Sequence, residues 1–173
     1  MAPEIDDTLV THVARRLQGS RTPGAASGAS AERLLREQPE VLAFVLAGTA
    51  QLNAESRAVG VFLGDVIFES FRLAGRDPRA LRTTAFVTAL RENREMALRV
   101  GQAHDRFAER YLKHSNTLRQ PALIRYVTGL LLEPEEASRH EIPRDDLGPL
   151  FIVLKSVIDV LDTDSTTGLE VGA

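Results

Sequence analysis

The sequence predicts an all-α fold, a compact bundle of five or six helices with a tethered amphipathic helix at the N-terminus. Three observations favour this class. Apolar residues recur at helical spacing along most of the chain, prolines and glycines stand where helices begin and end, and no segment shows a convincing strand pattern. Apolar residues make up 43% of the 173 positions, which is enough for one globular core.

The first 30 residues divide into a predicted helix and a predicted linker. Aliphatic residues recur every fourth position over residues 5–17, at Ile5, Leu9, Val13 and Leu17. Residues 18–30 are rich in Gly, Ala and Ser and carry no large apolar side chain, which is typical of a flexible linker. Residues 1–17 are therefore expected to form an arm that docks on a second copy or on another partner. Its interaction residues would be the four aliphatic side chains.

Helix-start signals for the domain expected over residues 31–162 occur at Ser30, Pro39, Pro78 and Pro121. Two of its helices, at about 55–74 and 144–162, are apolar on most sides. Such helices are usually central, so we expect these two to be the most buried and to touch. The helices predicted from these signals are 31–37, 39–51, 55–74, 78–113, 121–133 and 144–162. Residues 163–173 are expected to be a disordered tail.

Two segments of the chain, residues 38–45 and 120–127, resemble each other, as an internal duplication would predict. Residues 38–45 read Gln-Pro-Glu-Val-Leu-Ala-Phe-Val, and residues 120–127 read Gln-Pro-Ala-Leu-Ile-Arg-Tyr-Val. Each segment precedes an apolar helix, so the two could be copies of one helical unit. Chance similarity between short helical segments is the alternative.

Charge is unevenly distributed, although the net charge is only −3. Residues 78–119 carry nine basic and four acidic side chains, whereas residues 120–173 carry four basic and ten acidic ones. The basic face could contact a polyanion such as a nucleic acid. Interleaved acids and the overall acidity instead favour pairing with the acidic C-terminal third. The basic residues concerned are Arg91, Arg94, Arg99, Arg106, Arg110 and Lys113.

A few polar residues on apolar helices are candidates for chemistry. Asp65, Glu69 and Arg72 share one face of the helix at 55–74, which could be a cluster of acids and a base or an outward-facing charged stripe with interhelical ion pairs. Lys155 and Asp159 are spaced in the same way. Asn93 and His104 interrupt an apolar seam of the long helix and could line a pocket, but hydrogen bonding to neighbours is the simpler interpretation.

Known catalytic and metal-binding patterns are missing from the sequence. Cysteine is absent, no histidine has another histidine or a preceding glutamate at metal-ligand spacing, and Glu136 and His140 lie in a proline-flanked acidic segment. No phosphate loop, dinucleotide-binding motif or nucleophile elbow occurs. We therefore expect neither a metal nor a cofactor, and no apolar run is long enough to span a membrane.

The sequence-based interpretation is a non-enzymatic helical protein-interaction module, such as an adaptor, regulatory subunit or assembly component. It would self-associate through the N-terminal helix and act in the cytoplasm, and the excess of arginine over lysine suggests a bacterial source. Two alternatives stay open. One is a polyanion-binding regulator that uses the basic face of residues 91–113, and the other is an enzyme whose acid and base are dispersed, with Asp65 and Glu69 as first candidates.

Overall fold

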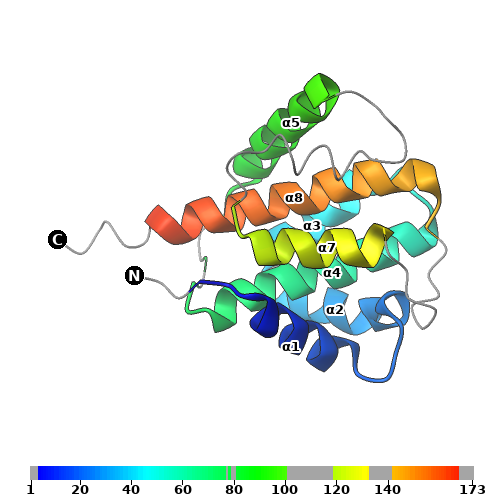
Figure 1. Ribbon diagram of the computed structural model, residues 1–173, viewed down its shortest axis with the longest axis vertical. Helices are drawn as coiled ribbons and strands as arrows, with labels where there is room; N and C mark the ends of the chain where they lie inside the picture. Colours follow the sequence, from blue (N-terminus) through cyan, green and yellow to red (C-terminus); the bar gives the residue numbers. More distant parts are fainter. Residues whose placement is uncertain (1–3, 77, 79–80, 101–118, 133–141, 168–173) are drawn as a thin grey trace.

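The computed structural model describes residues 4–76, 78, 81–100, 119–132 and 142–167. All regular structure in these ranges is helical, which confirms the predicted class (Figure 1). The helices are α1 Asp7–Gln18, α2 Pro23–Glu37, α3 Pro39–Gly48, α4 Ala54–Leu73, α5 Thr83–Val100, α7 Pro121–Leu132 and α8 Arg144–Thr167.

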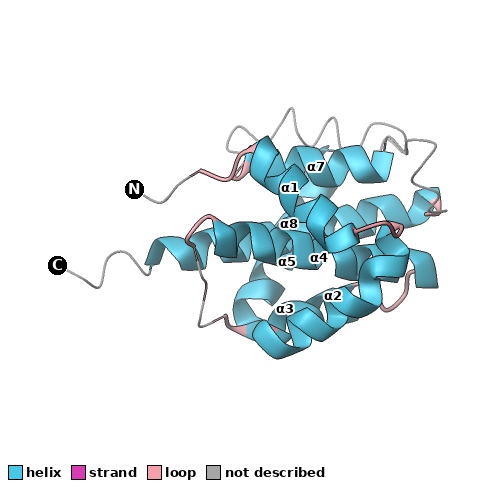
Figure 2. Cartoon of the chain, turned by 90° about the horizontal axis from the view of Figure 1, so that it is seen from below, coloured by secondary structure: helices cyan, strands magenta, loops and turns pink. Residues whose placement is uncertain are grey.

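Helices α4 and α8 lie in the middle of the molecule and pack against each other. Figure 2 shows α1 and α7 on one side of this pair and α2 and α3 on the other, so the helices form three layers. Every residue of α4 from Val59 to Phe71 is buried. The expected contact between these two buried helices is confirmed, because Phe62 and Phe68 of α4 and Phe151, Leu154 and Ile158 of α8 all belong to one buried apolar cluster.

Small residues allow the central helices to approach closely. A Cβ atom added at Gly60 would lie 3.0 Å from Leu150 of α8, and one at Gly64 would lie 3.3 Å from Val45 of α3. Contacts this short leave no room for a larger residue without movement of the neighbours. The Gly-x-x-x-Gly pair of α4 therefore serves helix packing within the chain.

The predicted flexible linker is wrong over most of its length. Helix α2 begins at Pro23, with Thr22 accepting a hydrogen bond from the backbone N–H of Ala25 through its side-chain oxygen. Ala26 and Ser30 are buried, and α2 packs along α4. Small side chains that suggested a linker instead permit close contact between two helices. The connection between α1 and α2 is only residues 19–22.

The long helix begins later than predicted. Pro78 was expected at the first turn, but it is not helical and α5 starts at Thr83. The carbonyl oxygen of Pro78 accepts a hydrogen bond from Gln38 Nε2 at 2.9 Å, so this oxygen is held by a side chain. At the other end of the chain α8 extends to Thr167, which corrects the expected tail over residues 163–167.

Both of the similar segments, residues 38–45 and 120–127, start a helix with proline at its first position, Pro39 in α3 and Pro121 in α7. The preceding glutamines differ in backbone conformation, with φ −151° at Gln38 and φ +53° at Gln120. Each helix is followed along the chain by one of the two central helices. A common origin of the two units stays a prediction.

Among the described residues, no helix combines the length and the apolar character that crossing a membrane requires.

Candidate functional site

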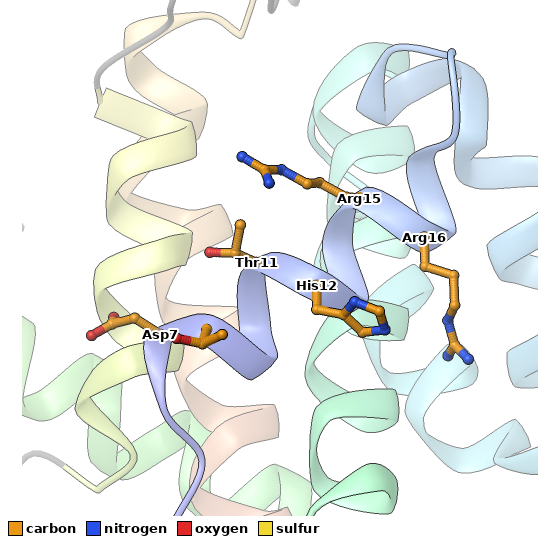
Figure 3. Close-up of a pocket in the computed structure, with 6 residues that line it drawn as sticks. Asp7, Thr11, His12, Arg15 and Arg16 are labelled. Carbon is orange, nitrogen blue, oxygen red and sulfur yellow. The ribbon is translucent and has the colours of Figure 1, made fainter.

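A shallow concavity of the described surface runs along α1 and is lined by Asp7, Thr8, Thr11, His12, Arg15 and Arg16. In Figure 3 Asp7, Thr11 and Arg15 point to one side of α1, whereas His12 and Arg16 point to the other. Asp7 accepts hydrogen bonds from Arg125 of α7, and Arg16 pairs with Glu69 of α4. Catalytic groups must converge on one reacting centre. These side chains diverge, so the concavity has the character of a charged surface and not of a reaction site.

The suspected acid–base cluster on α4 consists of ion pairs, two of which join α4 to other helices. Arg33 of α2 donates from Nε and Nη2 to Asp65 Oδ2, at 2.9 and 2.7 Å. Only 2% of the Asp65 side chain is exposed. A buried carboxylate needs such a partner, because removing a charge from water is expensive unless it is paired and hydrogen-bonded.

Glu69 lies one turn further along α4 and receives two arginines. Arg72 of the same helix donates to both of its carboxylate oxygens at 2.6 Å, and Arg16 of α1 donates to Oε1. The arrangement joins α1 to α4. Asp65, Glu69 and Arg72 were recognisable from the sequence. Their partners Arg16 and Arg33 were not, and they come from the predicted arm and from the helix predicted at 31–37.

The two carboxylates have pKa values shifted in opposite directions. Burial raises the pKa of Asp65 above 3.8, and the pairing with Arg33 does not fully offset this effect. Burial also disfavours the charged form of Glu69, but Arg72 and Arg16 outweigh it and bring the pKa of Glu69 below 4.5. Both carboxylates are occupied by arginines in the folded chain. An enzymatic role for them is left without support from the geometry.

The polar interruption of the seam on α5 is hydrogen-bonded within the fold. Asn93 Nδ2 donates to Ser156 Oγ at 3.1 Å and to Asp159 Oδ2 at 3.0 Å. Lys155 Nζ contacts both oxygens of Asp159 at 2.5 and 2.6 Å. Asn93, Lys155 and Ser156 are all buried between α5 and α8. The simpler interpretation of Asn93 is therefore confirmed, whereas His104 lies outside the described residues.

A second polar node joins the end of α4, the start of α7 and the C-terminal part of α8. Asp162 Oδ1 accepts from Arg76 Nη1 at 2.8 Å and from Gln120 Nε2 at 2.7 Å. Arg119 donates to Thr163 Oγ1 and lies 3.8 Å from the other oxygen of Asp162. Nothing in the sequence spacing indicated this node, because its members come from three separate segments.

A group of three or more histidine, aspartate or glutamate side chains suited to a metal ion does not occur among the described residues. His12 lies on the surface of α1. Glu136 and His140 are outside the described ranges.

The N-terminal aliphatic stripe, which consists of Ile5 before α1 and of Leu9, Val13 and Leu17 within it, packs on the chain's own core. Ile5 is 1% exposed and Val13 is fully buried, while Leu9 and Leu17 pack on the core with part of their surface exposed. Helix α1 lies against α4 and α7. Docking on a partner through this stripe stays a prediction, and it would require α1 to leave its place.

The basic face is described only in part. Arg91, Arg94 and Arg99 are exposed on α5, and none of them has an ion-pair partner among the described residues. Arg106, Arg110 and Lys113 lie outside the described ranges.

The structure also exposes large apolar side chains on α5 that the sequence analysis did not single out. Val87 is 60% exposed and Leu98 is 66% exposed. Their positions and those of Arg91 and Arg94 are separated by four, three and four residues, which places all four on one face of the helix. We call Val87, Arg91, Arg94 and Leu98 the α5 stripe. The spacing is visible in the sequence, but only the packing of α5 shows which face is left open.

Comparisons with known proteins give no relative: no family model matches the chain, and neither does a curated protein or a solved structure.

Proposed function

We propose that this protein is a non-enzymatic helical protein-interaction module of the cytoplasm, and that a partner protein docks on the α5 stripe. The observation that carries the proposal is the exposure of Val87 and Leu98 on a helix that packs chiefly against α8 (Figure 1). Single exposed aliphatic residues are ordinary on protein surfaces. Here two aliphatic side chains are more than half exposed on one face of a helix at the edge of the bundle. Together they form an apolar surface that a partner protein can contact.

The free energy gained by burying Val87 and Leu98 is sufficient for a specific contact. Complete burial of a valine or leucine side chain contributes about 1.5–3 kcal/mol. A few such anchors dominate the affinity of most interfaces, and arginine is among the residues most often found at them. The α5 stripe offers two aliphatic anchors with two arginines between them.

Charge favours an acidic partner over a second copy of the same stripe. Antiparallel pairing of two stripes would oppose Val87 to Leu98 and Arg91 to Arg94. Parallel pairing in register would oppose each arginine to itself. Both arrangements place like charges together, which is unfavourable in an interface. A partner surface with aliphatic residues at its ends and carboxylates in its middle matches the α5 stripe in both apolar contacts and charge.

Two other modes of action remain proposals. Self-association through Ile5, Leu9, Val13 and Leu17 needs a released α1. Binding of a polyanion has one favourable observation, namely that Arg91, Arg94 and Arg99 are exposed on the same helix. Polyanion binding would weaken steeply as salt rises, because phosphate contacts release counterions. An interface anchored by apolar side chains would depend on salt much less.

Site-specific photo-crosslinking tests the proposal directly. A photoreactive amino acid is placed at position 87 or 98 of the full chain, which is then irradiated in a lysate of its source organism. Leu35 on α2 is the matched control, since it is 65% exposed but lies on another helix. We expect one discrete protein adduct from positions 87 and 98 that is absent at position 35, and mass spectrometry should locate the crosslink in an acidic segment of the partner.

Three results would count against the proposal. Adducts of equal yield at position 35 would mean that exposure alone captures proteins. An adduct with a second copy of this chain would favour self-association. Retention on heparin that is lost when Arg91 and Arg94 are replaced by glutamine, without any protein adduct, would favour the polyanion alternative.

A further inference from the structure

The node around Asp162 contains two buried polar atoms without a hydrogen-bond partner among the described residues, Arg76 Nε and Gln120 Oε1. Both side chains already donate to Asp162 Oδ1, Arg76 through Nη1 and Gln120 through Nε2. Gln120 is 9% exposed, so bulk solvent has little access to it. A buried donor or acceptor left unpaired is expensive, and in folded proteins such groups almost always have a protein or water partner.

Rotation of the Gln120 amide does not remove the problem. The amide nitrogen of Gln120 donates to Asp162 Oδ1 at 2.7 Å. Exchanging the nitrogen and oxygen would place Oε1 against a carboxylate oxygen, and two acceptors would then face each other. The orientation is therefore fixed by Asp162, and Oε1 must find its partner elsewhere.

The chemistry of the two atoms and of their surroundings selects the class of ligand. Arg76 Nε–H can only donate, whereas Gln120 Oε1 can only accept, so a single molecule that contacts both atoms must both accept and donate. The guanidinium groups of Arg76 and Arg119 disfavour a cation, and Asp162 disfavours an anion. A neutral molecule with both capacities fits, and the smallest is water, which commonly satisfies buried polar groups of this kind.

We propose that the node is a binding site for ordered water, which accepts a hydrogen bond from Arg76 Nε and donates one to Gln120 Oε1. Such water joins the segment after α4 to the start of α7, beside the carboxylate of α8. It also supports Gln120 in an unusual backbone conformation. With φ of +53°, Gln120 occupies the left-handed region that non-glycine residues rarely adopt, and such positions persist only where the surroundings hold them.

The test combines a high-resolution crystal structure of the full chain with two variants. We expect an ordered water within hydrogen-bonding distance of Arg76 Nε and Gln120 Oε1. Arg76→Lys keeps a positive charge beside Asp162 but removes the Nε donor, so this water should be lost. Arg119→Lys is the matched control, because Arg119 faces the same carboxylate from the exposed side, and the water should stay.

A solution measurement covers the case in which a variant does not crystallise. The Nε–H proton of Arg76 should give a nuclear Overhauser cross-peak to a long-lived water, and the peak should persist in Arg119→Lys and vanish in Gln120→Met. The proposal is overturned if Arg76 Nε is bonded directly to a protein acceptor, or if no single water contacts both atoms in the crystal. An absent cross-peak in the unaltered chain overturns it equally.

Discussion

Gln38 and Gln120 both stabilise the segment that follows α4, Gln38 by direct contact and Gln120 through Asp162. Each glutamine immediately precedes a helix that begins with proline, and each is buried. Gln38 Nε2 donates to the carbonyl oxygen of Pro78, and Gln120 Nε2 donates to Asp162, which also accepts from Arg76. The segment that leaves α4 is thereby held at Arg76 and at Pro78.

The pair formed by Arg33 and Asp65 should respond unequally to single and double substitution. Arg33→Met leaves a buried carboxylate without its partner, and because the arginine is partly exposed we expect a loss of about 2–3 kcal/mol in the free energy of unfolding. Arg33→Met combined with Asp65→Leu removes both charges and should recover most of the loss. Urea denaturation of the three proteins measures this. A double variant no more stable than Arg33→Met would contradict the assigned pairing.

Asp65 and Glu69 should give opposite pH dependences. The pKa of Glu69 is lowered in the fold, so its ionisation stabilises the chain above pH 4.5 and this contribution is lost as pH falls through the folded pKa. The pKa of Asp65 is raised, so its contribution is present below pH 3.8 and is lost as pH rises through the folded pKa.

Thermal melts of Glu69→Gln and Asp65→Asn from pH 3 to pH 7 compare the two carboxylates. The difference between the unaltered chain and Glu69→Gln should shrink toward acid pH. The difference in melting temperature between the unaltered chain and Asp65→Asn should instead shift in favour of the unaltered chain toward acid pH. Parallel trends for the two variants would show that one of the environments has been misassigned.

One glycine substitution tests whether residues 23–30 are helical, and a second tests the packing of α3 on α8. Gly28 lies inside α2 with no atom within 4 Å of an added Cβ, so Gly28→Ala should raise stability by about 0.5–1 kcal/mol through helix propensity. An added Cβ at Gly48 would lie 2.8 Å from Val153, so Gly48→Ala should lower stability by about 1–3 kcal/mol. Chemical denaturation gives both values. No gain from Gly28→Ala would restore the flexible linker.

The place of α1 is tested by adjacent residues on opposite faces of the helix. Val13 is fully buried and His12 is exposed. Val13→Asp places a charge in the core and should lower the melting temperature strongly, whereas His12→Asp should change it little. Light scattering should give the same molecular mass for both. A lower mass for Val13→Asp at an unchanged melting temperature would instead identify α1 as an arm that docks on a second copy.

The fold class and the core followed from the sequence because they depend on local periodicity. The apolar positions of α4 and α8 repeat at helical spacing on most sides of each helix, and this pattern alone predicts central helices. Helix α2 was partly missed for a physical reason. Ala26 and Ser30 contribute little hydrophobic surface, and their burial depends on how closely α4 approaches, which no local pattern records.

The polar contacts could not be predicted in the same way. Asp65 and Glu69 were visible as a pair one turn apart, but their partners Arg33 and Arg16 are set by the packing of three helices. The node at Asp162 likewise combines residues from distant segments. The helical spacing of the α5 stripe can be read from the sequence. The exposure of the stripe cannot, because it depends on which face of α5 packs on α8.

Binding of a partner protein to the α5 stripe is tested most directly by the dissociation constant of that partner. The partner identified by crosslinking is titrated against the unaltered chain, Leu98→Asp and Leu35→Asp. Loss of one buried aliphatic anchor is worth about 1.5–3 kcal/mol, and 1.4 kcal/mol corresponds to about tenfold in affinity. We predict binding at least about tenfold weaker for Leu98→Asp and unchanged for Leu35→Asp. Equal affinities for the unaltered chain and Leu98→Asp would contradict the claim.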